Sequence, residues 1–292
     1  MQLPKLSFSS QTVLVTGASS GIGRETALAF AGAGANLVLA ARRAKTLNTV
    51  AAKARKLGAQ VLVVPTDVTK RPAVAACFAK GVERFGTVDI VINNAGVLKP
   101  AMVEDIRDAD LHAMLDVNVF GALHVMQEAV KLMRRQGHGH IVNLASLAGR
   151  RGMSPLGGYC ATKFALIGLT EALRMELDGT DIRVSMVLPG VVDTPMAADL
   201  QDDPSVPKLW PERLNMPPSW VVASIFLAIR LKLTEIAVPP GAALIEKIAA
   251  LAPGAADSIL RVAIGAAKRA AAARGSALAV RRRHATKRRG HP

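Results

Sequence analysis

The sequence predicts an α/β fold, in which a parallel β-sheet is covered by helices on both faces. Through the first 240 residues, short β-branched or apolar runs alternate with longer segments whose apolar residues recur every three or four positions. The strand-like runs are 12–16, 36–40, 61–65, 88–93, 140–145, 182–188 and 235–238. Helical crossovers between parallel strands are right-handed, so this alternation favours a doubly wound, Rossmann-type sheet of about seven strands.

The segments between the strands predict the helices. Helical periodicity covers 21–32, 69–84, 111–136, 159–178 and 219–231. Residues 196–218 contain five prolines and few periodic apolar positions, which predicts a loop or a pair of short helices. Because ligands of such sheets bind at the carboxyl ends of the strands, this loop is expected over the binding edge. Residues 241–274 are expected to form a helical C-terminal extension.

The charge of the chain is concentrated at its C-terminal end. Ten lysines and arginines and no acidic residue lie between 261 and 292, which accounts for most of the formal net charge of +15. A basic, disordered and solvated tail over 275–292 is the simplest interpretation. Nucleic acid is a poor partner, because no aromatic residue lies among the charges to stack on bases. Peripheral membrane contact through the tail stays open as an alternative.

Bulk composition sets the class of protein. Half of the residues are hydrophobic and 3% are aromatic, which predicts a globular core of Ala, Val, Leu and Ile. No apolar run is long enough to span a membrane and the N-terminus lacks the pattern of a secretory signal, so a cytoplasmic location is expected. Cys77 and Cys160 have no companion ligands at suitable spacing, so no metal site is expected.

A glycine-rich turn connects the first strand to the first helix. Residues 16–23 read TGASSGIG and stand directly between a strand and a helical run. Glycines here let the backbone approach a pyrophosphate, while the N–H groups at the helix start favour the anion. A tight turn without a ligand is the alternative, which the position between strand and helix disfavours. The expected phosphate contacts are Gly17, Ser19, Ser20, Gly21, Ile22 and Gly23.

The end of the second strand indicates which dinucleotide would bind. An NAD site usually has an acidic residue here that holds the ribose 2′-hydroxyl. The sequence instead has Arg42 and Arg43 after two alanines. Guanidinium groups without a carboxylate suit a 2′-phosphate, so NADP(H) is the expected cofactor, with Arg42 favoured as the direct contact. The alternative is that both arginines simply begin a solvated helix.

Further motifs follow the turn in a characteristic order. They are Asp67-Val68, Asn93-Asn94-Ala95-Gly96, Asn118, Ser146, Tyr159 with Lys163, and the segment from Pro189 and Gly190 through Val192 to Thr194. In this order and spacing the chain resembles the classical short-chain dehydrogenase/reductase family over roughly residues 8–240. We therefore expect residues 1–240 to form one NADP-binding domain of that family, which includes the substrate loop 196–218.

Tyr159 and Lys163 are the expected proton-transfer pair. They lie four residues apart in a helical segment, so their side chains leave the same face. A nearby ammonium and the positive oxidised nicotinamide favour phenolate, which would let Tyr159 exchange a proton with a carbonyl or alcohol near neutral pH. An amphipathic surface pair is the alternative, but Tyr159 is the only tyrosine and lies thirteen residues after Ser146. The Ser146 hydroxyl would hydrogen-bond the substrate oxygen, with an ordinary strand-capping serine as the alternative.

The resemblance implies the contacts at the adenosine end of the cofactor. Asp67 would contact the adenine through its side chain, and Val68 through its backbone N–H. Asn93, Ala95 and Gly96 would line the adenosine ribose and stabilise the sheet. A purely structural role suits Asn94 equally well.

The resemblance also implies the contacts at the nicotinamide end. Lys163 would hydrogen-bond the nicotinamide ribose, and Asn118 would hold a water that links Lys163 to solvent. In the turn that begins at Pro189 and Gly190, the Val192 backbone and the Thr194 hydroxyl would hold the carboxamide. Ser146, Tyr159, Lys163 and Asn118 are thus the expected catalytic residues.

These observations predict an NADP(H)-dependent oxidoreductase that interconverts a carbonyl and a secondary alcohol. Apolar residues of the substrate loop favour a lipophilic ketone, steroid-like or acyl substrate, unless they simply pack the loop. They are Met196, Leu200, Leu209, Trp210, Leu214 and Met216. The resemblance implies a homo-oligomer, dimer or tetramer, through the helices 111–136 and 159–178. The alternatives are a non-catalytic NADP-binding regulator and a membrane-associated protein that uses its basic tail.

Overall fold

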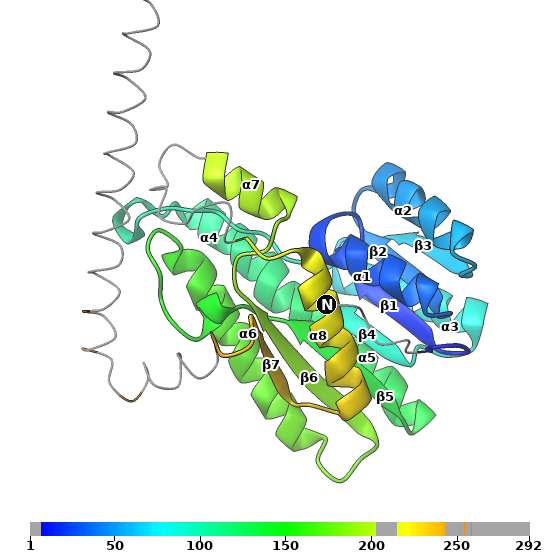
Figure 1. Ribbon diagram of the computed structural model, residues 1–292. Helices are drawn as coiled ribbons and strands as arrows, with labels where there is room; N and C mark the ends of the chain where they lie inside the picture. The colour runs from blue at the N-terminus through cyan, green and yellow to red at the C-terminus, as the bar shows by residue number, and fades with distance from the viewer. Residues whose placement is uncertain (1–6, 203–214, 243–250, 252–253, 255–257, 259–292) are drawn as a thin grey trace, which may run out of the picture.

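The computed structural model describes residues 7–202 and 215–242, with the single residues 251, 254 and 258. Within these residues, seven parallel strands form one sheet in the order β3-β2-β1-β4-β5-β6-β7 (Figure 1). The strands are β1 Thr12–Thr16, β2 Asn36–Ala41, β3 Val61–Pro65, β4 Ile90–Asn93, β5 Gly139–Leu144, β6 Ile182–Pro189 and β7 Glu235–Val238. The predicted doubly wound, Rossmann-type sheet is confirmed, and each predicted strand has its counterpart.

Helices cover the two faces of the sheet. The α-helices are α1 Gly21–Gly32, α2 Ala44–Lys56, α3 Arg71–Phe85, α4 Asp108–Leu115, α5 Ala122–Gln136, α6 Gly157–Glu176, α7 Pro195–Asp202 and α8 Pro218–Leu231. Two 3-10 turns, η1 Val103–Asp105 and η3 Leu147–Gly149, and the π-helical turn η2 Asp116–Gly121 complete the described elements. Residues of α1, α2 and α8 form one core layer, and residues of α3, α5 and α6 form the other.

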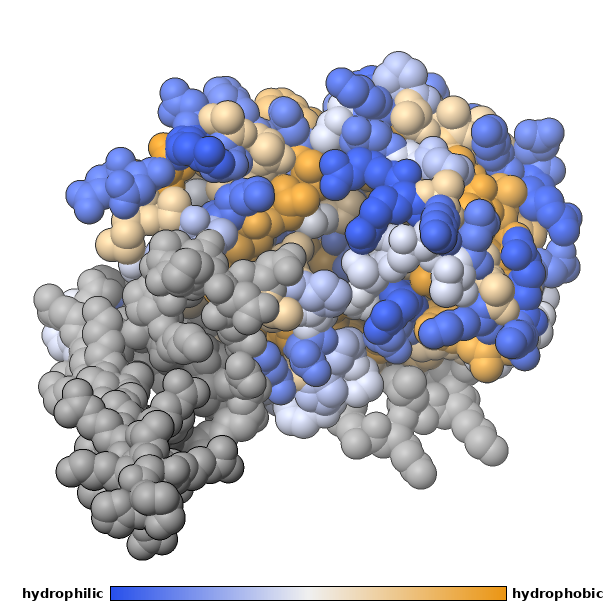
Figure 2. Space-filling view, turned by 90° about the horizontal axis from the view of Figure 1, so that it is seen from above, coloured by the Kyte–Doolittle hydropathy of each residue, from blue (hydrophilic) through white to orange (hydrophobic). Residues whose placement is uncertain are grey.

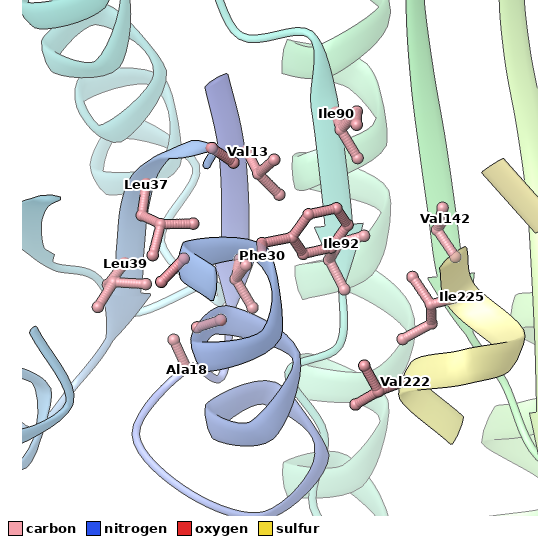
Figure 3. Close-up of a cluster of buried hydrophobic side chains, with 14 of the residues drawn as sticks. Val13, Ala18, Phe30, Leu37, Leu39, Ile90, Ile92, Val142, Val222 and Ile225 are labelled. Atoms are coloured by element: carbon pink, nitrogen blue, oxygen red, sulfur yellow. The ribbon is translucent and has the colours of Figure 1, made fainter. Parts of the chain in front are cut away.

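Alternation along the strands builds both layers. In β1, Val13 and Val15 belong to the layer under α1 and α8, whereas Leu14 belongs to the opposite layer. Phe30 of α1 is fully buried at the centre of the first layer, beside Ile92 in Figure 3. Its ring lies 4.6 Å from that of Phe226 in α8. Three of the sparse aromatic residues, Phe8, Phe30 and Phe226, thus meet at the α1–α8 contact.

The start of β4 differs from the prediction, because a side chain replaces the hydrogen bonds between strands there. β4 begins at Ile90, two residues later than expected. The N–H of Val88 donates to Gln136 Oε1, and Gln136 Nε2 donates back to the Val88 carbonyl, each at 3.2 Å. Because α5 satisfies the backbone of Val88 in this way, the residue lies outside the ladder. No periodicity in the sequence reports such a contact.

The helix predicted over 111–136 is continuous in the structure, but it begins earlier, at Asp108, and contains a π-helical turn. α4 ends at Leu115, the π-helical turn η2 follows directly, and α5 begins at Ala122. A π-helical turn adds one residue to a turn, and such turns are frequent at functional sites. Here the turn carries Asn118, whose side chain bonds the backbone of Val97 in the neighbouring loop. Apolar periodicity continues across the interruption, so the sequence pattern did not reveal it.

The sheet order places the ligand-binding edge. The chain moves outward from β1 through β2 to β3 and then returns to place β4 on the other side of β1. Loops after β1 and β4 therefore separate at a topological switch point, where ligands of open α/β sheets bind. Of the expected substrate loop, α7 and residues 215–218 belong to the described structure, while Leu209, Trp210 and Leu214 lie outside it. The expected extension and tail lie almost entirely outside it as well.

Candidate active site

The turn after β1 has a backbone conformation that favours glycine. Gly17 has φ +65° and Gly21 has φ +53°, in the left-handed region that other residues adopt only with strain. The N–H of Ala18 donates to the carbonyl of Ala40 at 3.2 Å, which ties the turn to the end of β2. Ser19 is buried beneath the turn. The helix α1 then begins directly at Gly21.

Asn94 packs this turn against the end of β4. Its Nδ2 donates to the carbonyl of Thr16 at 2.9 Å, and its backbone N–H donates to Thr16 Oγ1 at the same distance. A Cβ on Gly23 would lie 2.5 Å from Asn94 Nδ2, and one on Gly17 would lie 2.8 Å from it. Close packing therefore requires glycine at both positions. The structural role considered for Asn94 is confirmed.

The start of α1 fits an anionic group. Ser20 precedes the helix without a side-chain capping bond, and the first turn contains no acidic residue. The N–H groups of a first turn have no partner inside the helix, and they attract anions such as phosphate. The turn that contains Gly21 and Ile22 thus fits the pyrophosphate of a dinucleotide.

The end of β2 presents two exposed arginines. Arg42 follows the last residue of β2, and Arg43 precedes the first residue of α2. Within the described part of the chain, neither side chain has a hydrogen bond or ion pair. Arg43 does begin a solvated helix, as the alternative interpretation held. Arg42 lies between strand and helix and can turn toward the cleft.

Hydrogen bonds hold the turn after β3, one set within the turn itself and one contact with α5. Asp67 Oδ1 accepts hydrogen bonds from the N–H and the hydroxyl of Thr69 at 3.0 and 2.9 Å. The Val68 carbonyl lies 3.0 Å from His124 Nδ1 of α5. The predicted adenine contacts thus lie on a rigid turn. No motif or spacing in the sequence singles out His124.

Asn93 stabilises the sheet, as expected. Its side chain is buried, and Nδ2 donates to the carbonyl of Ala122 at 3.0 Å and to Asn143 Oδ1 at 2.9 Å. The side chain therefore joins β4 to β5 and α5. Ala95 and Gly96, which follow the strand, are partly exposed at the binding edge.

Ser146 lies two residues beyond β5 and does not end the strand itself. Its Oγ accepts a hydrogen bond from the Ala148 N–H at 3.1 Å, which caps the turn η3. The same hydroxyl donates to the Pro189 carbonyl at 3.2 Å. The Ser146 hydroxyl also lies near enough to Tyr159, in the first turn of α6, to lower the pKa of the phenol. The two hydroxyls expected at the site are therefore neighbours.

Burial dominates the pKa of Tyr159 in this structure. It raises the pKa to about 12, and the neighbouring Ser146 hydroxyl opposes this shift only in part. Lys163 Nζ lies 5.6 Å from the centroid of the Tyr159 ring. Removing the phenol from water disfavours its anion, and this effect outweighs the neighbouring cation.

Lys163 lies on the same face of α6 as Tyr159, and its side chain is buried. Its Nζ donates to the carbonyl of Leu144 at 2.9 Å, and burial lowers its pKa to about 8. Both protonation states of this amine are therefore accessible near neutral pH. Gly96 lies beside it, since a Cβ there would be 3.8 Å from Nζ. The loop after β4 and the helix α6 thus meet at Lys163.

Asn118 uses its whole side chain within the protein. Oδ1 accepts from the Val97 N–H at 2.8 Å, and Nδ2 donates to the Val97 carbonyl at 2.8 Å and to Thr162 Oγ1 at 3.0 Å. A water held at Asn118 would therefore have to bond its backbone. The side chain fixes η2 to the loop after β4 and to α6.

The segment after β6 lies against the start of α1. A Cβ on Gly21 would be 3.2 Å from Thr194 Cγ2, and the Thr194 hydroxyl donates to the Val192 carbonyl at 3.2 Å. Gly190 donates its N–H to the Val238 carbonyl at 2.8 Å. Met216 is buried and pairs with Val192, which anchors the return of the substrate loop. Pro189 is the last residue of β6, and its carbonyl oxygen accepts a hydrogen bond from the Ser146 hydroxyl.

The described residues contain no group of three or more His, Cys, Asp or Glu side chains that could hold a metal ion. Among them, no helix is both long and apolar enough to traverse a lipid bilayer.

Comparison with known proteins identifies the family. The family model for short chain dehydrogenases matches residues 11–205. The 3-oxoacyl-(acyl-carrier-protein) reductase of Thermotoga maritima is 35% identical over 189 residues, which are 65% of this chain and 77% of the relative. The 17-beta-hydroxysteroid dehydrogenase 13 of Rattus norvegicus is 37% identical over 208 residues, which are 70% of this chain and 68% of the relative.

Solved structures agree with this assignment. A short chain dehydrogenase/reductase from Burkholderia phymatum in complex with NAD superimposes with a TM-score of 0.74 at 28% identity, over 83% of this chain and 93% of that one. An alcohol dehydrogenase from Thermococcus sibiricus complexed with 5-hydroxy-NADP gives a TM-score of 0.69 at 29% identity, over 78% and 95%. With the nucleotide-binding turn and the ordered motifs in place, the chain belongs to the classical short-chain dehydrogenase/reductase family and is an oxidoreductase of that type.

Proposed function

We propose that the protein interconverts a lipophilic carbonyl compound and its secondary alcohol with NADP(H). The observation that carries this proposal is the gathering of the Ser146 and Tyr159 hydroxyls beside the buried amine of Lys163. Two hydroxyl groups and an amine, from the carboxyl end of β5 and the amino end of α6, can bind a carbonyl oxygen and deliver a proton to it. When bound, the dinucleotide supplies or accepts the hydride.

Each of the three residues has a separate task in the proposed mechanism. Ser146 donates its hydrogen to the Pro189 carbonyl in the free protein, and it would redirect that hydrogen to the substrate oxygen. Tyr159 would transfer its phenolic proton to the same oxygen, or accept one from an alcohol. The raised pKa of Tyr159 suits it as a proton donor in reduction, since the phenol stays protonated at neutral pH. After the transfer, Lys163, with a pKa of about 8, would return a proton from solvent to Tyr159.

The exposed arginine after β2 supports NADP(H) over NAD(H). Arg42 has no carboxylate partner within the described residues, and no acidic residue stands at the end of β2. A guanidinium group forms paired, charge-assisted hydrogen bonds with a phosphate. Solved relatives of this chain include complexes with either type of dinucleotide, so the preference rests on this arginine.

Exposed apolar side chains around the binding edge support a lipophilic substrate. Met102, Val103, Met153 and Met196 are 36–77% exposed and lie on segments that follow β4, η3 and β6. The first and second of these segments are joined, because Ala101 pairs with Leu156. Figure 2, seen from the side on which α7 lies in Figure 1, shows apolar surface gathered between polar groups. The two relatives named for acyl and steroid substrates are consistent with this proposal.

Apolar side chains on η2 and α6 support a homo-oligomer. Phe120, Phe164 and Met175 are 52%, 46% and 80% exposed. Large apolar side chains gathered on neighbouring elements are typical of surfaces that associate. We propose that these helices form the contact between copies of the chain, which light scattering of the purified protein would test.

A substrate panel tests the proposed activity. Lipophilic ketones, a steroid ketone, an acyl thioester and small charged oxoacids are each incubated with NADPH, and nicotinamide absorbance is followed. The same panel with NADH is the control for cofactor preference. We expect the highest kcat/KM with a lipophilic carbonyl and NADPH. A preference for the small charged compounds would contradict the proposed substrate class, and absence of turnover with every compound would contradict the proposed activity.

A further inference from the structure

One face of α6 carries four residues at intervals of four positions. They are Tyr159, Lys163, Ile167 and Glu171. Residues four apart lie above one another on a helix, so these side chains form a single row. At 1.5 Å per residue the row extends about 18 Å along the helix axis. Its first two members are the proposed proton donor and its partner amine, whereas the proposed mechanism assigns no task to Ile167 or Glu171.

The segment from Leu144 to Arg150 runs along this row. The Leu144 carbonyl accepts from Lys163 Nζ at 2.9 Å, and Ser146 lies near enough to Tyr159 to lower its pKa. Gly149 comes next and lies so close to α6 that a Cβ would be 2.8 Å from the Lys163 carbonyl oxygen. The same Cβ would be 2.7 Å from the Cδ1 atom of Ile167.

Arg150 completes the row of contacts. Its Nη2 donates to Glu171 Oε1 at 2.8 Å, and also to Glu235 Oε2 at 2.5 Å. Glu235 is the first residue of β7, so this one guanidinium joins the Ser146 turn to α6 and to the edge of the sheet. The side chains of Arg150, Glu171 and Glu235 are 32%, 45% and 26% exposed. A partly exposed charge pair of this kind contributes little to the stability of a fold.

We propose that Arg150, held by Glu171, is a positioning residue that fixes where the Ser146 hydroxyl lies relative to the Tyr159 hydroxyl. The short turn η3 connects Ser146 to Arg150, so a shift of Arg150 along α6 moves the serine along the same row. Small displacements matter in a site of this kind, since an error of about 1 Å in placement can cost about 10²-fold in rate. The proposal rests on the proposed function, because it assumes that Ser146 and Tyr159 act together on the substrate.

Replacing Arg150 tests whether this residue positions Ser146 or merely stabilises the fold. In Arg150→Met and in Glu171→Gln, we expect kcat for carbonyl reduction to fall on the order of 10–100-fold. The dissociation constant of the dinucleotide and the midpoint of thermal unfolding are expected to stay near the wild-type values. Arg150→Lys keeps the charge and is expected to recover part of the lost kcat. Arg183→Met is the matched control, since Arg183 makes an exposed ion pair with Asp181 on β6, away from the row.

The pH profile gives a second readout that a merely structural role would not change. Ser146 lowers the pKa of Tyr159, so a displaced Ser146 in Arg150→Met moves the midpoint of the kcat profile to higher pH. Wild-type kcat and an unchanged midpoint in Arg150→Met would overturn the proposal, as would equal losses in Arg183→Met. Failure of the proposed function is a different result, because then the wild-type enzyme itself would reduce no carbonyl compound.

Discussion

The side-chain amide of Asn94 donates to the carbonyl oxygen of Thr16 at 2.9 Å, and this bond joins the turn after β1 to the turn after β4. Thr16 returns the contact, since its hydroxyl accepts the N–H groups of Asn94 and Ala95. The ends of two central strands are thus locked at the switch point of the sheet. The phosphate-binding turn owes its shape to this contact as well as to its glycines.

Gly23→Ala should disrupt this lock. The added Cβ would lie 2.5 Å from both Asn94 Nδ2 and the Gly17 carbonyl oxygen. We expect a destabilisation of about 1–3 kcal/mol, as for other overpacked sites, together with a large loss of dinucleotide affinity. Denaturant unfolding and dinucleotide fluorescence measure the two effects. Gly32→Ala is the control in the same helix, where the Cβ meets no atom within 4 Å, and equal behaviour of the two variants would refute the role of the close contact.

Arg42→Ala should change cofactor preference. Charge-assisted hydrogen bonds contribute about 1.5–3 kcal/mol, so kcat/KM with NADPH is expected to fall roughly 10–100-fold. The value with NADH is expected to change little, because that cofactor has no 2′-phosphate. Lys56→Ala, at the exposed end of α2, controls for the loss of a positive charge. An equal fall with both cofactors would argue against a contact between Arg42 and the phosphate.

His140 should make the protein sensitive to mild acid. The imidazole is buried in β5, with Nε2 2.7 Å from Ser185 Oγ. Burial lowers its pKa to about 4, with smaller contributions from the positive charges of Arg183 and Lys232. His140 therefore binds a proton more readily in the unfolded chain than in the folded protein. The stability that its neutral imidazole contributes is present above pH 6.5 and is lost as the pH falls toward 4. The loss from this group is on the order of 3 kcal/mol at 1.36 kcal/mol per pKa unit.

Urea unfolding at pH 6.5 and pH 4 measures this effect in the wild type and in His140→Gln. Glutamine can still donate to Ser185 but cannot be protonated in this range. The variant should therefore lose less stability between the two pH values than the wild type does. An identical loss in both proteins would show that His140 is not the responsible group.

Most of the sheet follows from local sequence. All seven strands were predictable because buried parallel strands are short apolar runs between helical segments. The doubly wound arrangement also followed, since right-handed crossovers limit the arrangements, whereas the order of the strands was not predicted. What escaped prediction depends on side chains distant in sequence, such as Gln136 at the backbone of Val88 and Asn118 at that of Val97.

The candidate site was predictable as a set of residues but not as a set of contacts. Ser146, Tyr159 and Lys163 could be named from their motifs, and the structure brings them together. The direction of the Tyr159 pKa shift was not predictable, because burial is a property of the folded site and outweighs the nearby amine. The pair of Arg150 and Glu171 is 21 positions apart, a spacing to which no local pattern refers.

The central claim is that the phenol of Tyr159 transfers the proton, and the most direct test is the single-turnover rate of carbonyl reduction by Tyr159→Phe with saturating NADPH. The account predicts a fall of about 10²–10⁴-fold, the contribution of a positioned acid, with dinucleotide binding unchanged. A rate equal to that of the wild type, measured with the dinucleotide bound, would contradict it.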